Sequence, residues 1–150
     1  MPDTDKYLKT EHLTVAARLG SLAQIRSFLR ATCTTLSCDY AASEEFNREM
    51  AELELASTEL ISNVIRHGFK GLPAGELELT CQIDDDSRLQ LQIVHHGRPF
   101  ESVDGEVPEI TEPQENGMGL YLIAECVDSV KYSMSADGAS LIHVTKTLTT

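Results

Sequence analysis

The sequence predicts an α+β fold, a two-layer α/β sandwich in which one mixed, largely antiparallel sheet is covered on one face by three helices. Two pairs of alternating segments separated by short turns, at residues 76–95 and 129–148, predict most of the sheet. Three segments with helical periodicity predict the covering layer. The 150 residues suit one domain, 1–150, with a sizeable core, and they show no internal repeat.

The N-terminal part is expected to supply one strand and two helices. Residues 11–19 (EHLTVAARL) alternate in part and predict the strand. Residues 20–36 then predict an amphipathic helix, with Ser21 as a candidate N-cap. The second helix should begin near residue 43 and stop at Gly68, since glycine suits a helix C-terminus. The apolar face of the first helix would consist of Leu22, Ile25, Phe28 and Leu29.

The remaining elements are two hairpins and a helix between them. Residues 76–84 (ELELTCQID) and 88–96 (RLQLQIVHH) alternate with period two across a polar turn, which predicts the first hairpin. Residues 116–130 predict the third helix, and residues 129–148 close the sheet as a second hairpin. One face of the first hairpin would carry Leu77, Leu79, Cys81, Ile83, Leu89, Leu91 and Ile93.

Composition excludes several classes of function. A formal net charge of -12 argues against nucleic-acid or acidic-membrane binding, since both need a basic surface. No apolar run approaches the roughly 20 residues of a membrane span, and the first residues lack a signal-peptide core, so a cytoplasmic location is expected. The cysteines match no zinc spacing and are expected to be buried free thiols. They are Cys33, Cys38, Cys81 and Cys126.

The second expected helix carries a polar stripe. Glu59, Asn63 and His67 recur at every fourth position, so the stripe turns by only about 40° per step. Leu60 and Val64 lie beside it on the face expected to be buried. A polar stripe that borders a buried face can form the wall of a pocket, although an ordinary amphipathic boundary gives the same pattern.

Two further motifs follow along the chain. The first strand pair ends in a turn at Gly97, which is either a simple strand-ending turn or part of a site. Gly117 and Gly119 open the third helix, where glycines and unpaired helix amides favour phosphate binding, but a GxG is also an ordinary helix start. Residues 101–115 between them show no periodicity and hold six acidic residues, so they predict a functional or mobile loop.

The order of these motifs resembles the GHKL ATPases, and more narrowly the anti-sigma-factor serine/threonine kinases of bacterial partner-switching systems. The segments ELISNVIRHGF (59–69), GRPFE (97–101) and NGMGLYLIAECVDSVKYS (116–133) are similar to that family's nucleotide boxes. The resemblance covers nearly the whole chain, from the first strand to VTKTL. It implies the histidine-kinase-like ATPase fold, or Bergerat fold, and the binding of ATP with Mg²⁺.

The resemblance also implies a role for each matching residue of the helix and the turn. Asn63 would be the magnesium ligand, and its amide oxygen is a hard donor suited to that ion. Glu59 would be the base that accepts the proton of the attacking serine hydroxyl. His67 would line the pocket or be structural. Gly97 would form the turn of the second box, and Arg98 would be the cation nearest the phosphates.

The third box and the loop before it would hold the phosphates. By the same resemblance, Gly117, Gly119 and the amide of Leu120 would bind phosphate oxygens, and residues 101–116 would be the lid. The chain departs from the family at His95, where the family has an aspartate that receives the adenine amino group. A neutral imidazole accepts one hydrogen bond through its bare nitrogen. The acidic lid is expected to raise the pKa of His95 and to oppose nucleotide binding at low pH.

The function implied by the resemblance is a protein serine kinase. It would phosphorylate a STAS-type anti-sigma-factor antagonist and alternately hold a sigma factor or another regulatory protein. A homodimer is also implied, and the small and apolar residues of LTVAA (13–17) are expected to serve the uncovered face of the sheet. The alternatives are a binding module of the same fold that does not turn over ATP, and an α+β domain of unrelated function.

Overall fold

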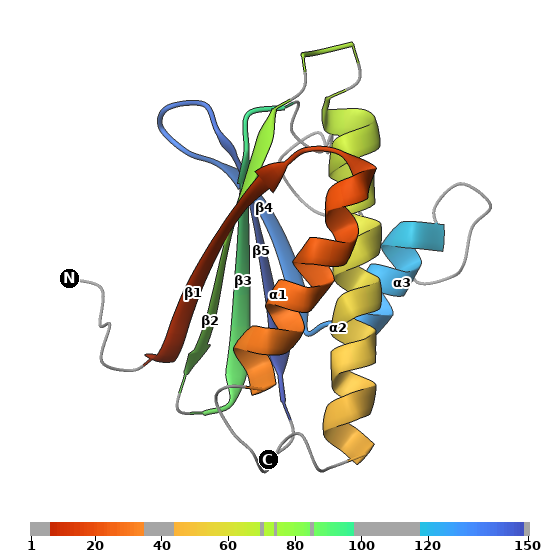
Figure 1. The fold of residues 1–150 in the computed structure, drawn as a ribbon, viewed down its shortest axis with the longest axis vertical. Coiled ribbons are helices and arrows are strands. Elements are labelled where there is room, and N and C mark those ends of the chain that lie inside the picture. The colour runs from red at the N-terminus through yellow and green to blue at the C-terminus, as the bar shows by residue number, and fades with distance from the viewer. Residues whose placement is uncertain are drawn as a thin grey trace.

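The computed structural model describes residues 7–34, 44–69, 71–73, 75–84, 86–97 and 118–148. In this part of the chain five strands form one sheet, and three α-helices lie against one face of it (Figure 1). The two-layer sandwich with three helices on one face is therefore confirmed.

The sheet has the strand order β1-β2-β3-β5-β4. All four pairings between described strands are antiparallel, so the expectation of a mixed sheet is corrected in this detail. Two helices separate β1 from β2 and return the chain to the end of the sheet where β1 stops, which makes β2 run the opposite way. The Ala17 amide donates to the Gly75 carbonyl at 2.8 Å at that end. The strands are β1 (Tyr7–Ala16), β2 (Glu76–Asp84), β3 (Arg88–His95), β4 (Ser129–Met134) and β5 (Ser140–Thr147).

Both predicted hairpins are confirmed, and their registers follow from the alternation of side chains. Leu79 lies opposite Ile93 and Cys81 opposite Leu91 in the β2–β3 pair, and all four side chains are buried. Because successive residues of a strand point to opposite faces, this register places the buried apolar residues of the hairpin against the helices, while Val94 lies on the open face.

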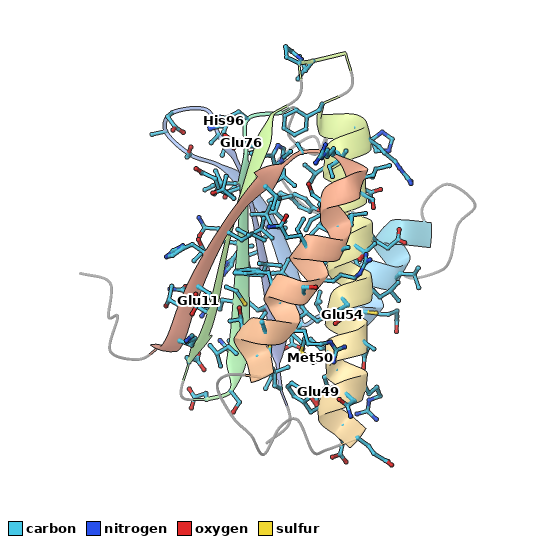
Figure 2. The ribbon with its side chains drawn as sticks, viewed as in Figure 1. Glu11, Glu49, Met50, Glu54, Glu76 and His96 are labelled. Carbon is cyan, nitrogen blue, oxygen red and sulfur yellow. The ribbon has the colours of Figure 1, made fainter. Side chains whose placement is uncertain are left out.

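The helices are α1 (Leu22–Thr34), α2 (Glu44–Asn63) and α3 (Met118–Cys126). Ile25 and Leu29 of α1 are fully buried against the sheet, as the periodicity predicted. The layer of helices is also joined across its outer surface, where Arg30 Nε of α1 lies 2.7 Å from Glu54 Oε1 of α2. Figure 2 shows Glu54 on the side of α2 that faces α1.

The prediction that Ser21 caps α1 is wrong in its mechanism. Ser21 lies in a short 3-10 turn, η2 (Leu19–Ser21), and its buried hydroxyl donates to the Ala16 carbonyl at 2.8 Å. An N-cap side chain would instead accept a hydrogen bond from a helix amide. The hydroxyl therefore ties the start of α1 to the end of β1.

The apolar residues of the first strand face the helices and not the open face of the sheet. Val15 and Ala17 are buried in the core, and Leu13 packs against it. Thr14 and Ala16 are exposed on the opposite face. The expectation that LTVAA supplies an apolar surface for the uncovered face is therefore wrong, because the alternation of β1 assigns its larger apolar side chains to the core.

Three of the four cysteines lie among the described residues, and all three are free and buried. Burial raises the pKa of the Cys33 thiol to about 12, and it raises the pKa of Cys81 and Cys126 as well. The expectation of buried thiols is confirmed for these residues, while Cys38 lies outside the described part of the chain. None of the described helices is long and apolar enough to cross a bilayer.

Candidate functional site

The polar stripe of α2 borders the core at two of its three residues. Glu59 and Asn63 are half-buried, while the neighbouring Leu60 and Val64 are buried. His67 is exposed and does not share this border. The polar border predicted from the sequence therefore consists of the carboxylate and the carboxamide, one helical turn apart.

A change of helix type explains why His67 leaves the stripe. The α-helical hydrogen bonds end at Asn63, and a π-helical turn, η4 (Val64–Gly68), follows directly. A π-helix bonds residue i to i+5, so each turn holds more residues and the later side chains rotate away from the ideal helical stripe. The turn ends at Gly68, which confirms the expected end of the helix. Such π turns are frequent at functional sites.

The end of α2 and the end of β3 touch through their backbones. A Cβ added to Gly97 would lie 2.6 Å from the Gly68 carbonyl oxygen and 3.1 Å from the ring of Phe69. Only glycine permits this approach, so Gly97 does more than end a strand. The contact brings together the first and second motifs, which lie far apart in the sequence.

His95 is buried at this junction, with an exposed fraction of 2%. It points to the helix-covered side of β3, opposite the buried Leu77 of β2. Its ring lies 5.9 Å from that of Phe69, centroid to centroid. Figure 2 labels the next residue, His96, and shows it at the same end of the sheet as Glu76. His95 thus lies beneath the end of α2.

The hydrogen bonding of His95 differs from the expectation. The Gly97 amide donates to His95 Nδ1 at 3.2 Å, so the bare nitrogen of the ring already has a partner. Burial, together with the charge of His96, lowers the pKa of His95. The expectation that this pKa is raised is therefore wrong, because removal from water disfavours the imidazolium.

The start of α3 supplies the third part of the site. Gly119 and Leu120 lie in the first turn of α3, where backbone amides have no intrahelical partner and attract anions. The helix packs along α2, which carries the polar stripe (Figure 1). Arg98, Gly117 and the lid at residues 101–116 lie outside the described residues.

Sequence reasoning missed Lys146, which holds the other end of α3. Its buried ammonium donates to the carbonyl of Cys126, the last residue of the helix, at 2.5 Å and lies 3.7 Å from Glu52 of α2. A cation is favourable at a helix C-terminus. The sequence did contain a signal for its burial, because Lys146 alternates in phase with the buried Ile142 and Val144 of the last strand.

The chemistry of the donor set fits a magnesium nucleotide. The described residues contain no group of three or more His, Cys, Asp and Glu side chains that could enclose a metal. Mg²⁺ does not need such a group, because it keeps several waters and takes few protein ligands when it binds with phosphates. Asn63 offers one hard oxygen, and the start of α3 offers amides for phosphate.

The fold and these motifs define a histidine kinase-like ATPase domain. The family model of that name matches residues 15–145, and the chain belongs to this family. The anti-sigma F factor of Bacillus cytotoxicus is 26% identical over 135 residues, which cover 87% of this chain and 90% of that protein. The serine-protein kinase RsbW of Listeria innocua is 33% identical over 100 residues, covering 61% of this chain and 63% of that protein.

Solved structures support the fold. The structure of the RsbU and RsbW domains of a Mycobacterium tuberculosis protein superimposes with a TM-score of 0.64 at 16% identity, covering 93% of this chain and 32% of that chain. The predicted fold and the predicted relationship to anti-sigma factors and serine kinases are thus confirmed.

Proposed function

We propose that this protein binds a magnesium nucleoside triphosphate, for which the family points to ATP, and transfers its γ-phosphoryl group to a serine of a partner protein. The observation that carries the proposal is the close approach of Gly97 to Gly68. It brings the end of η4, which continues the helix of the stripe, against the end of β3, and α3 packs along the same helix.

Each step of the transfer has a candidate group. The serine oxygen would attack the γ-phosphorus, its proton would pass to the Glu59 carboxylate, and the bond to the bridging oxygen would break to release the nucleoside diphosphate. Asn63 would hold the magnesium ion, which neutralises charge on the phosphates. The amides of Gly119 and Leu120, together with Gly117 and Arg98, would hold phosphate oxygens. His67 would lie at the rim, since it is exposed.

The named relatives support the choice of partners. They are an anti-sigma F factor and a serine-protein kinase, so we propose a STAS-type anti-sigma-factor antagonist as the substrate. The alternate partner would be a sigma factor or another regulatory protein, and the setting would be the cytoplasm. A net charge of -12 would favour a basic surface on a partner.

Two measurements test the proposal. A ligand that binds only the folded state raises the melting temperature, so Mg²⁺ with a purine nucleoside triphosphate should raise it and a chelator should reverse the rise. Proteins captured on the immobilised chain should include a small antagonist that gains phosphoserine by mass spectrometry when nucleotide is added. The Glu59→Gln variant is the control, because it should capture the same antagonist and leave it unmodified.

A second candidate function is a binding module of the same fold that holds its partner without turning over a nucleotide. The position of His95 favours it, since its bare nitrogen is engaged by Gly97 and cannot accept a hydrogen bond from adenine. The same measurements distinguish the two candidate functions. The binding module should capture a partner protein, show no rise in melting temperature with ATP, GTP or ITP, and leave the captured protein unphosphorylated.

A further inference from the structure

We propose that His95 makes this nucleotide site select a purine with a carbonyl oxygen at position 6, as in guanine or hypoxanthine nucleotides, over adenine. The inference rests on the proposed function, because it assigns the base of the nucleotide that the site would hold. It follows from the hydrogen bond between Gly97 and His95 and from the burial of the ring.

The first step is the position of the proton on the ring. A backbone amide can only donate, so the bond from the Gly97 amide at 3.2 Å requires Nδ1 of His95 to be unprotonated. A neutral imidazole carries one proton, which must then lie on Nε2. The lowered pKa of His95 keeps the ring in this neutral form at neutral pH. His95 therefore presents a donor at Nε2 and no free acceptor.

The second step is that the ring is held in this orientation. Only 2% of His95 is exposed, and it lies on β3, which is paired on both sides. Phe69 lies against the ring at a tilt of 51°. Turning the ring over would leave the Gly97 amide without its partner, so the observed orientation is favoured. No hydrogen-bond acceptor for Nε2 occurs among the described residues.

The third step is the chemistry of the base. Adenine carries an amino group at position 6, which donates hydrogen bonds, while guanine carries a carbonyl oxygen there, which accepts them. A base placed against His95 through this edge would meet Nε2–H donor to donor if it were adenine. It would form a hydrogen bond if it were a 6-oxopurine. A site built around a donor rejects a ligand that leaves this donor unpaired.

The experiment is a set of binding titrations of the whole chain by calorimetry with Mg-ITP, Mg-GTP and Mg-ATP at neutral pH. ITP is the critical probe, because inosine differs from guanosine only in lacking the amino group at position 2. The wild-type protein should bind ITP and GTP about tenfold more tightly than ATP, as expected for one hydrogen bond gained instead of a repulsive contact. Equal affinity for ITP and ATP, or tighter binding of ATP, would overturn the assignment.

Two variants that are isosteric with each other separate a donor from an acceptor at this position. In His95→Asp one carboxylate oxygen can accept from Gly97 and the other can accept from an amino group, so preference should reverse toward ATP. In His95→Asn the amide oxygen can accept from Gly97 while its NH₂ group still donates, so preference for ITP should remain. Melting curves without nucleotide establish that each variant is folded. If either variant is unfolded, the comparison of ITP with ATP on the wild type decides the question.

The outcomes distinguish this inference from the function on which it rests. Failure of all three nucleotides to bind would overturn the proposed function and the inference together. Binding of ATP in preference to ITP, with the same ratio in the wild type, His95→Asp and His95→Asn, would overturn the inference and leave the kinase proposal standing. A base that does not contact the side chain of residue 95 would give this second result.

Discussion

Glu59 and Asn63 lie one turn apart on α2 and are both half-buried, yet the proposed chemistry separates them. Asn63→Ala should abolish magnesium-dependent nucleotide binding, because the ion would lose its protein ligand. Glu59→Gln should leave binding nearly intact and stop phosphoryl transfer, because the amide cannot accept the proton. Calorimetry with a magnesium nucleotide measures the first effect, and phosphorylation of the captured antagonist measures the second.

The control for this pair is Glu125→Gln on α3, which removes an exposed carboxylate outside the stripe. It should change neither binding nor transfer. An equal loss of binding in the Asn63 and Glu59 variants would show that the two roles are assigned wrongly.

His95 should also make the stability of the fold depend on pH. Its pKa is lowered in the folded protein, so below the ordinary histidine pKa of about 6.5 the unfolded chain binds more protons than the folded one. The free energy of unfolding should therefore fall as the pH decreases from about 7.5 to about 5.5. Urea unfolding at the two pH values measures the loss, which should be smaller in His95→Gln.

A matched control for the pH effect is His12→Gln, at an exposed position on β1. The free energy of unfolding of this variant should differ between the two pH values by as much as that of the wild type. His95→Gln should still lose part of its free energy of unfolding at the lower pH, because burial also lowers the pKa of His143. If His95→Gln lost as much free energy of unfolding between the two pH values as the wild type, the lowered pKa of His95 would be contradicted.

At the scale of the elements, the contact between the ends of α2 and β3 depends on the missing side chain of Gly97. In Gly97→Ala the added methyl would lie 2.6 Å from the Gly68 carbonyl oxygen and 2.9 Å from its carbon, and backbone atoms cannot move aside cheaply. We expect a loss of about 1–3 kcal/mol in the free energy of unfolding and weaker nucleotide binding. Urea denaturation and calorimetry measure the two effects.

Gly20→Ala is the control for this substitution. The nearest atom to an added Cβ is 4.0 Å away there, so the methyl meets no obstacle. Its stability should stay close to that of the wild type. A Gly97→Ala protein as stable as Gly20→Ala would show that the two ends can separate without cost.

The orientation of α3 should depend on Lys146. Lys146→Met keeps much of the side-chain volume but leaves the Cys126 carbonyl without its charged donor and Glu52 without its nearby cation. We expect a loss of about 1.5–3 kcal/mol, the range for a hydrogen bond to a charged group. Lys131→Met, at an exposed position on β4, should cost much less in the same denaturation experiment. Equal losses would mean that Lys146 contributes only its apolar stem.

At the scale of the whole molecule, the open face of the sheet is the surface that no helix covers (Figure 1). Its side chains are mainly polar, and neighbouring strands are linked across it, as between His12 and Thr80 at 3.0 Å and between His143 and Gln90 at 3.1 Å. An apolar face would need burial, whereas this one tolerates water. Any contact between copies of the chain there would depend on hydrogen bonds more than on apolar area.

The predicted homodimer is therefore expected to respond to salt. Each copy carries a formal net charge of -12, so two copies repel each other at long range. Light scattering at micromolar concentration should give the mass of a dimer, and the dimer should dissociate less on dilution at higher ionic strength, because salt screens the repulsion. A monomeric mass at both low and high salt would contradict the prediction.

Local periodicity was enough to establish the elements and their buried faces. The alternation in ELELTCQID and RLQLQIVHH determined the register of the β2–β3 hairpin, because a slip by one residue would turn Leu79 and Leu91 toward water. The spacing of Ile25 and Leu29 determined the buried face of α1 in the same way. Such patterns are readable because each depends only on residues close together in the chain.

Contacts between distant segments decided the chemistry of the site. No pattern in the sequence could show that Gly97 meets Gly68 or that η4 turns His67 away from Asn63. The alternation of the last strand indicates that Lys146 is buried, but it does not show that Lys146 holds the end of α3. The same is true of His95, whose proton lies on Nε2 because the Gly97 amide reaches Nδ1 and whose pKa falls because the packed layers exclude water. Periodicity records which side of an element is buried, but the protonation of a side chain depends on the particular atoms that the fold brings against it.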